Sequence, residues 1–258
     1  MNYQQIVDDI NRSAYATQDV IDWYADLDLI FKPEAAILKK IDTVVRDKKI
    51  LDIGIGGGRT TKFLIELSRD YAGIDYTPRS VEVARKKYPA ANILGCDVRD
   101  MRVFDDHSFD FAFFSLNGID SINHEDRMKA LNEIHRVLRP GALFSFSSHN
   151  RDYKYFDKFP WQERRFDPNH LKSCLYTFVR LPKHYRMKKH ELRTDHYAIM
   201  NDTAHGFLML VYYISIAEQM KQLAEAGFAD AEAYDKEGNH VERDDSSPWI
   251  YYLARRAA

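Results

Sequence analysis

The fold of this chain is decided by the stretch Ile50-Leu51-Asp52-Ile53-Gly54-Ile55-Gly56-Gly57-Gly58-Arg59-Thr60-Thr61. It begins as a short apolar strand, continues as a glycine-dense turn and then, with no proline, becomes a helical pattern. The glycines allow positive φ angles and let a ligand approach the backbone within van der Waals contact, which a Cβ atom would prevent. The helix that opens at Arg59 adds unpaired N–H groups and a positive dipole end, which suit a carboxylate or a phosphate. We therefore expect a ligand-binding turn at the tip of the first strand of an α/β fold.

The spacing of the glycines separates two kinds of nucleotide-binding turn. The dinucleotide fingerprint G-x-G-x-x-G would require glycine at position 59, where this chain has Arg59. Asp52, Gly54, Gly56 and Gly58 instead match D/E-x-G-x-G-x-G, and in this the chain resembles the class I S-adenosylmethionine (SAM)-dependent methyltransferases. The resemblance implies a Rossmann-like, seven-stranded, mostly parallel sheet with helices on both faces and a reversed final strand. It also implies SAM as cofactor and S-adenosylhomocysteine as product.

The next two predicted strands each end in a carboxylate. Asp75 closes the strand that begins at Tyr71, and a crossover would bring it beside the glycine turn, where it can accept hydrogen bonds from ribose hydroxyls. The alternative is a strand-end acid solvated in a turn. The resemblance makes Asp75 the ribose-binding acid, with Tyr76 beside it. It also implies that Asp97 accepts from the adenine amino group and that the Val98 amide faces a ring nitrogen.

The fourth predicted strand ends in a turn that should face the chemistry. It is uniformly apolar, as a central parallel strand should be, and it leads into Ser115, Leu116 and Asn117. We count Ser115 and Asn117 among the expected cofactor contacts. Methyltransferases that act on nucleobase amines carry N/D-P-P-F/Y at this point, and cytosine-C5 enzymes carry Pro-Cys. This chain has neither motif, which disfavours a nucleobase acceptor.

Candidates for a catalytic base come from the end of strand five and from the segment after it. His149 follows the strand on the ligand edge of the sheet, although a lone histidine is often a structural or surface residue. His196, Tyr197 and His205 are weaker candidates, because the geometry of their segment is invisible in the sequence. The aromatic residues there would alternatively form a cage for a cationic amine. We expect no metal, since no carboxylate-rich site is apparent.

The residue composition and the hydrophobic pattern divide the chain into three parts. Residues 48–150 and 215–258 form the SAM-binding core, residues 1–47 an N-terminal helical cover, and residues 151–214 an inserted α+β cap for substrate recognition. Within the cover, helical spacing predicts helices over 20–30 and 37–45, and Tyr15, Trp23 or Tyr24 would either line the site or pack on the sheet. Within the cap, we expect a buried strand at 206–214 and a polar antiparallel partner at 185–200.

The most basic run of the chain lies in this insertion, from Arg180 to Arg193 in the sequence. Such a run is most simply a solvated strand face. Two alternatives are a clamp for an anionic substrate group and a contact with RNA.

Composition limits the partners. Lys and Arg total 37 against 39 for Asp and Glu, a net charge of −2, so nothing steers the whole chain toward DNA or an anionic membrane, and RNA is disfavoured. The two cysteines suggest a reducing cytoplasm. The longest apolar run, 206–217, is too short to span a bilayer, and no signal peptide is apparent. The pattern leaves monomer and homodimer open.

These observations favour one function and leave three alternatives. We expect a SAM-dependent methyltransferase that moves a methyl group to an oxygen or nitrogen of a small-molecule acceptor by in-line displacement. An RNA or nucleobase methyltransferase and a non-catalytic SAM-binding module are the alternatives that keep the same cofactor site. A nicotinamide oxidoreductase is disfavoured by Arg59.

Overall fold

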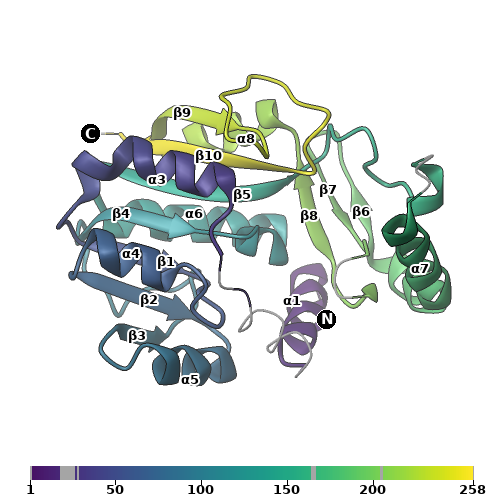
Figure 1. Cartoon of the computed structure of the whole chain (residues 1–258), viewed down its shortest axis with the longest axis horizontal. Helices are drawn as coiled ribbons and strands as arrows, with labels where there is room; N and C mark the ends of the chain where they lie inside the picture. Colours follow the sequence, from purple (N-terminus) through teal and green to yellow (C-terminus); the bar gives the residue numbers. More distant parts are fainter. Residues whose placement is uncertain (1, 18–26, 28, 164–166, 204–205, 258) are drawn as a thin grey trace.

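A ten-stranded sheet runs through the molecule (Figure 1). The computed structural model describes residues 2–17, 27, 29–163, 167–203 and 206–257. Five parallel strands lie in the order β3-β2-β1-β4-β5. They are β1 (Ile50–Ile53), β2 (Tyr71–Asp75), β3 (Asn92–Gly95), β4 (Phe109–Phe114) and β5 (Leu138–Asn150). This is the open α/β sheet that the glycine stretch predicts.

The last strand runs against the others, as expected. β10 (Trp249–Arg256) pairs antiparallel with β5 on one side and with β9 (Phe228–Tyr234) on the other. The preceding helix α8 (Ile216–Glu225) begins at Ser215, whose hydroxyl accepts from the Glu218 N–H, and it is followed by Gly227 at φ +83°. The capping signal and the glycine therefore fix this helix between β8 and β9.

The sheet has ten strands rather than the expected seven, because the insertion extends it. β8 (Val211–Ile214) pairs parallel with the end of β5, β7 (Tyr197–Met200) pairs antiparallel with β8, and β6 (Leu192–Arg193) forms the edge. The expected partner at 185–200 is a strand only in its second half. The helices α7 (Pro168–Met187) and η3 (Lys188–His190) take up the first part, so the basic run is mostly helical and the strand interpretation was wrong there.

Helices cover both faces of the sheet (Figure 1). On one face α3 (Lys32–Val45) and α4 (Thr61–Leu67) bury apolar side chains against β1, β4 and β10. On the other face α6 (His124–Val137) and α8 pack against the opposite sides of the same strands. α5 (Pro78–Lys87) packs against β3 through Val81 and Ala84. All four residues of β1 are buried, which explains why three of them are apolar, while the fourth is the buried carboxylate Asp52.

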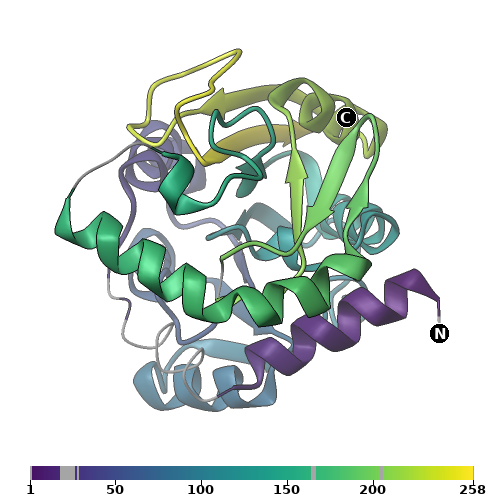
Figure 2. The same ribbon diagram turned by 90° about the vertical axis from the view of Figure 1, so that its right-hand side faces the viewer.

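An N-terminal helix that we did not expect lies beside the carboxyl ends of the strands (Figures 1 and 2). This helix, α1 (Tyr3–Tyr15), is capped by Asn2 and is fixed by Asn11, whose amide exchanges hydrogen bonds with the backbone of Leu210 at 2.7 and 2.9 Å. The helix expected at 20–30 falls mostly outside the described residues. The helix expected at 37–45 is confirmed as part of α3. Among the described helices, none has the length and apolar character needed to cross a membrane.

Candidate functional site

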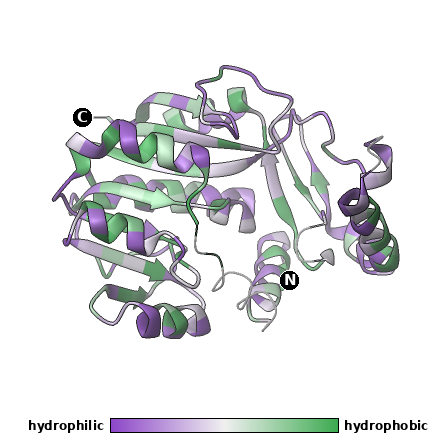
Figure 3. Ribbon diagram, in the orientation of Figure 1, coloured by the Kyte–Doolittle hydropathy of each residue, from purple (hydrophilic) through white to green (hydrophobic). Residues whose placement is uncertain are grey.

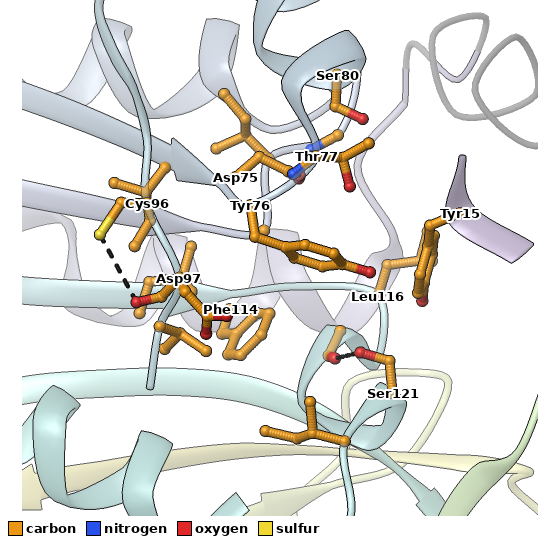
Figure 4. Close-up of a pocket in the computed structure, with 18 of the residues that line it drawn as sticks. Tyr15, Asp75, Tyr76, Thr77, Ser80, Cys96, Asp97, Phe114, Leu116 and Ser121 are labelled. Carbon is orange, nitrogen blue, oxygen red and sulfur yellow. Dashed lines mark hydrogen bonds between the residues drawn. The ribbon is translucent and has the colours of Figure 1, made fainter. Parts of the chain in front are cut away.

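A pocket opens at the carboxyl ends of β1 to β4, beneath α1 (Figure 4). Its free space, counted out to open solvent, is about 1030 Å³. The glycine turn, the ends of β2 and β3 and the turn after β4 form its walls, and α1 contributes a further side. Open α/β sheets bind their ligands at this edge, so the position agrees with the sequence-based expectation.

The centre of the pocket is built from backbone groups around one carboxylate. Gly54 and Gly56 line it with φ angles of +64° and +53°. The Gly56 N–H donates to Asp75 Oδ2 at 2.9 Å, and the Thr77 N–H donates to Asp75 Oδ1 at 2.8 Å. These donors leave part of the acceptor capacity of the carboxylate for a ligand. We call these four residues the glycine-turn site.

Burial affects the Asp75 carboxylate. Asp75 is only 7% exposed, and burial raises its pKa above the ordinary value, although the N–H groups of Thr77 and Gly56 oppose the shift. The two amides thus offset part of the cost of desolvating the charge. The carboxylate is held at the pocket surface with its oxygens fixed in direction.

An aromatic ring explains two of the glycines near the pocket. A Cβ added at Gly54 would lie 2.7 Å from the Phe114 ring, and one added at Gly118 would lie 2.3 Å from it. Phe114 itself lines the pocket (Figure 4). Gly58, by contrast, does not contribute to the described lining. It has φ +84° and faces Tyr88, so its role is to let the turn continue into α4.

Asp52 lies behind the turn rather than in the pocket. It is fully buried and accepts hydrogen bonds from Thr60 Oγ1 and the Tyr71 hydroxyl, both at 2.9 Å. Burial raises the pKa of Asp52 to about 7, against the effect of these two donors. The expected cofactor residue Asp52 therefore acts on the site indirectly, by tying β1 to β2 and to the start of α4.

Arg59 stands where the dinucleotide-binding fingerprint has its third glycine, and its charge is neutralised by Glu34. Arg59 donates to both oxygens of Glu34, at 2.8 and 2.6 Å, and to the Leu29 carbonyl at 2.9 Å. Both charged side chains are buried, and Arg59 forms part of the pocket wall. Its charge is balanced within the protein, so this wall offers little net attraction for a diphosphate.

Asp97 lines the pocket but already has four donors. Oδ1 accepts from the backbone N–H and Nε of Arg99, and Oδ2 accepts from Nη2 of Arg99 at 2.6 Å and Nη2 of Arg12 at 2.7 Å. Burial alone would raise the pKa of Asp97, but the Arg99 hydrogen bonds and the Arg12 charge lower it below its ordinary value. Four donors fill the usual capacity of a carboxylate. The expected adenine contact thus requires one of them to move, whereas Val98 lines the pocket as expected.

One face of α1 completes the pocket. Arg12 lies over the Tyr76 ring at 4.6 Å, and Tyr15 meets the same ring edge-on at 6.3 Å (Figure 4). The lining residues of this helix are Asp8, Asn11, Arg12 and Tyr15. Their spacing of three, one and three residues places them on one face of the helix, and this spacing is the feature of the sequence from which the face could have been predicted. Sequence reasoning identified only Tyr15 among them, and Trp23 and Tyr24 lie outside the described residues.

A second polar cluster lies at the end of β5, beside the β4 turn. Asp120 Oδ2 accepts from His149 through its backbone N–H at 2.6 Å and its Nδ1 at 2.7 Å. Asp120 Oδ1 accepts from Arg127 at 2.6 Å and from the Ser148 hydroxyl at 2.7 Å. We call these four residues the β5-end network. A carboxylate on Nδ1 favours the tautomer in which Nε2 is the acceptor, as a general base needs.

Arg127 holds the network together. Its guanidinium donates to the Ile119 carbonyl, Asp120, Ser148, Gln219 and Gln222, so its five N–H groups are used. It is fully buried and lies 4.5 Å from the Tyr212 ring centroid. Neither Asp120 nor Arg127 was among the candidates from sequence, because their partners come from segments far along the chain.

The remaining candidates lie away from the pocket described here. His196 is on the surface and pairs with Glu218 at 2.9 Å. The Tyr197 ring stacks on His124 at 4.4 Å, within the inserted strands. His149 itself is not among the described lining residues, although its strand is adjacent. His205 lies outside the described residues.

The two candidate residues in the turn after β4, Ser115 and Asn117, lie in different surroundings. Ser115 lines the pocket, as expected. Asn117 is buried in the left-handed conformation at φ +56°, and its N–H donates to Ser147 at 2.8 Å. Its side-chain oxygen has no hydrogen-bond partner among the described residues.

Cys96 lines the pocket without being reactive. Burial and neighbouring acids raise its pKa to about 11, so it remains a thiol at neutral pH. Across the described ranges, no three His, Cys, Asp or Glu side chains gather as a metal ion would require.

Comparison with known proteins shows what the residues around this pocket are similar to. A family described as "Methyltransferase domain" matches residues 51–146, which run from β1 into β5. The chain is 35% identical over 98 residues to a demethylmenaquinone methyltransferase of Chlorobaculum tepidum, covering 38% of this chain and 39% of that one. It is 30% identical over 109 residues to a ubiquinone biosynthesis O-methyltransferase of Cereibacter sphaeroides, covering 42% and 44%. The chain thus spans less than half the length of these curated relatives.

A solved structure shows the same fold over the whole chain. It is the 1,6-didemethyltoxoflavin-N1-methyltransferase of Burkholderia thailandensis, with bound 1,6-didemethyltoxoflavin and S-adenosylhomocysteine. The TM-score is 0.62 at 15% identity, and the alignment covers 100% of this chain and 92% of that one. At this identity the likeness establishes the Rossmann-like fold and nothing finer.

Proposed function

Residues 51–146 match the family described as "Methyltransferase domain", and from that match we propose that the chain transfers a methyl group from SAM to a small-molecule acceptor. The glycine-turn site carries this proposal. It places a carboxylate with remaining acceptor capacity beside glycines that allow close approach, at the ligand edge of the sheet. The alternatives with the same cofactor, an RNA or nucleobase methyltransferase and a non-catalytic SAM-binding module, gain no support from the described residues that line this pocket.

The residues present fit SAM in most respects. Asp75 is suited to ribose hydroxyls, while Tyr76, Val98 and Ile122 supply apolar walls for a flat ring. Arg59 is neutralised by Glu34, so a diphosphate would gain little there. Asp97 is the exception, because Arg12 occupies the remaining acceptor position on Oδ2.

The chemistry would depend mainly on positioning. SAM, when bound, supplies a sulfonium methyl group that is already activated for in-line displacement. The chain has to hold the acceptor in line with that methyl group and exclude water, and such orientation is worth on the order of 7–11 kcal/mol in well-aligned systems. Leu116, Ser121 and the α1 face would form the wall on the acceptor side.

We further propose that His149, which lies outside the pocket lining but at the end of the adjacent strand, removes the proton when the acceptor is a hydroxyl that extends from the pocket toward it. Asp120 fixes the imidazole through Nδ1, so Nε2 is the acceptor of the proton. A neutral amine would need less help from a base. The curated relatives include an O-methyltransferase, and the solved neighbour is named for N1 methylation, so both atoms remain within the proposal.

Titration calorimetry tests the proposed cofactor. SAM should bind, Asp75→Asn should weaken binding by about tenfold or more because a buried charged acceptor is lost, and NAD should give no heat. The matched control is Asp110→Asn, a carboxylate far from the pocket that pairs with Arg139, and it should leave SAM binding unchanged. Binding of NAD in place of SAM would overturn the proposal.

An untargeted mass comparison would then identify the acceptor. Extracts of cells with and without the gene are searched for a compound that gains the mass of one methylene. Purified chain with SAM should methylate that compound. If the purified chain produces no S-adenosylhomocysteine from SAM in any of these extracts, the non-catalytic SAM-binding module is favoured instead.

A further inference from the structure

The long helix of the insertion turns its apolar side outward. Leu171, Leu175, Phe178, Val179 and Tyr185 form what we call the α7 outer face, and each of these residues is 63–65% exposed. They recur at steps of three, four and seven residues, which is one stripe of a helix. Figure 2 shows α7 crossing one side of the molecule beside α1, with no other element over it in that view.

The three buried residues of the same helix are polar, and the half-buried Met187 adds an apolar contact with the protein. His170, Thr177 and His184 face the protein, and His184 Nδ1 lies 3.1 Å from Asn201 Oδ1. Figure 3 shows hydrophilic and hydrophobic residues alternating along α7. A surface helix normally places its apolar stripe on the core and its polar side in water. The inverted arrangement of α7 indicates that its outer face meets an apolar environment.

The charges beside the outer face point to what that environment is. Residues 168–190 contain six Lys and Arg residues and no Asp or Glu, in a chain whose net charge is −2. Lys172, Lys183 and Arg186 are exposed and lie along one border of the stripe by helical spacing. Two of the nearby acids are engaged elsewhere, since Asp167 caps the helix and Asp157 pairs with Arg193 at 2.9 Å.

An aromatic residue extends the surface. Trp161, in η2 (Pro160–Gln162), is 43% exposed and stacks on Phe159, which in turn meets His184 of α7. Trp and Tyr favour the boundary between lipid headgroups and acyl chains. Trp161 and Tyr185 therefore add amphipathic side chains around His184, near one end of this apolar and basic surface.

We propose that the α7 outer face docks on an anionic lipid bilayer. An apolar stripe with basic borders is the pattern of a helix that lies in the membrane interface, and each of the two features strengthens the other. A second copy of the chain fits less well, because a two-fold contact through α7 would bring basic borders together without a carboxylate between them. The sequence-based expectation of no membrane partner considered the net charge and spanning segments, and neither bears on a surface helix.

Vesicle flotation of the full chain tests this proposal independently of methyl transfer. Vesicles of phosphatidylcholine with about one third phosphatidylglycerol should carry the protein, while pure phosphatidylcholine vesicles should carry about tenfold less, and added salt should release it. Leu175→Glu/Phe178→Glu should lower the bound fraction by about tenfold. Lys172→Gln/Lys183→Gln/Arg186→Gln should remove the preference for the anionic lipid.

The matched control is Val44→Glu/Val103→Glu. It makes the same chemical change at two apolar residues, 53% and 60% exposed, that lie outside the α7 outer face. It should float like the unaltered chain. Equal loss in the control and in Leu175→Glu/Phe178→Glu would contradict the proposal, as would absence of flotation with the anionic vesicles. A dimer in sedimentation that Leu175→Glu/Phe178→Glu dissociates, without vesicle binding, would assign the face to a second copy instead.

Discussion

The glycine-turn site and the β5-end network each hold a buried carboxylate, but they hold it by different means. Asp75 receives the backbone N–H groups of Gly56 and Thr77, one of which is only two residues away. Asp120 instead receives mainly side chains, those of Arg127, Ser148 and His149, together with the His149 N–H, from up to 29 residues away. A backbone-built site follows from a local motif, whereas a side-chain-built site depends on how separate elements pack.

The two sites also differ in what a single substitution should do. A backbone N–H donor is kept through most side-chain substitutions, so a single substitution should remove only part of the interactions of the glycine-turn site. The β5-end network joins η1 (Gly118–Ser121), α6, β5 and α8 through one guanidinium, so it should fail abruptly.

The largest effect should follow replacement of the central arginine. Arg127→Leu leaves the Asp120 charge buried without its main partner, so the free energy of unfolding should fall by about 3–5 kcal/mol. Chemical denaturation measures this. Arg136→Leu, in the same helix, removes a half-exposed arginine paired with Glu133 and Asp106, and it should cost about 1 kcal/mol or less. Similar losses in both variants would remove the distinction between the two sites.

The next effect should be on turnover. His149→Gln should lower methyl transfer to a hydroxyl acceptor by about a hundredfold or more, because the proposed base is lost, while SAM affinity stays within about twofold. The rise of the rate with pH that a base produces should disappear as well. His196→Gln is the matched control, since His196 lies on the surface beside Glu218, and its turnover should be unchanged. An unaltered rate in His149→Gln would exclude His149 from the mechanism.

The third effect is the pH dependence of the unfolding free energy that arises from Asp52, which lies behind the glycine turn. Burial raises the pKa of Asp52 from 3.8 to about 7, so the native state binds a proton more tightly than the unfolded state. The stability gained from this proton is complete below pH 3.8 and is lost as pH rises toward 7. Asp52→Asn cannot titrate, so its unfolding free energy should not show this loss, which amounts to about 1.4 kcal/mol per pH unit at most.

Denaturation of the unaltered chain and of Asp52→Asn across this pH range isolates the contribution of Asp52, because the other carboxylates are common to both. Asp106→Asn serves as the control with the opposite sign. Arg136 lowers the pKa of Asp106, so that carboxylate stabilises the fold only when ionised. A constant difference between the unaltered chain and Asp52→Asn would mean that Asp52 is ionised throughout.

The smallest effect should come from Arg12 of α1, in the N-terminal helical cover. Arg12→Ala removes a half-exposed partner of Asp97 and frees an acceptor position on Oδ2 for the adenine amino group. SAM should then bind more tightly, by about fivefold or less, and stability should change by less than about 1 kcal/mol. Calorimetry with SAM decides the sign. Weaker binding would show that Arg12 contacts SAM or that α1 needs Arg12 to cover the pocket.

Local patterns predicted most of the fold. The glycine stretch, the apolar strands and the capping box at Ser215 each act within a few residues, so they identify β1, β2, β4 and α8 from sequence. The insertion was harder, because the basic residues at 185–190 fit a solvated strand and a solvated helix equally well. Its pairing with β5 rests on only two residue pairs, which no local pattern specifies.

The candidate site divides in the same way. Gly54, Gly56 and Asp75 were predictable, since strand order alone brings them to one edge. Asp97 shows the limit, because Arg99 is its near neighbour in the sequence, while its contact with Arg12 depends on a helix that was not expected. Asp120 and Arg127 could not be assigned a role before the packing of α6 against β5 and α8 was known.

The Phe114 ring has a consequence for redesign of this pocket. Because it presses against both Gly54 and Gly118, residues of two separate turns, one after β1 and one after β4, share one small volume. An engineer who wants to admit a bulkier acceptor should therefore shorten Phe114 first, and only then try alanine at Gly118. In natural relatives, the same crowding should make these positions drift together rather than one at a time.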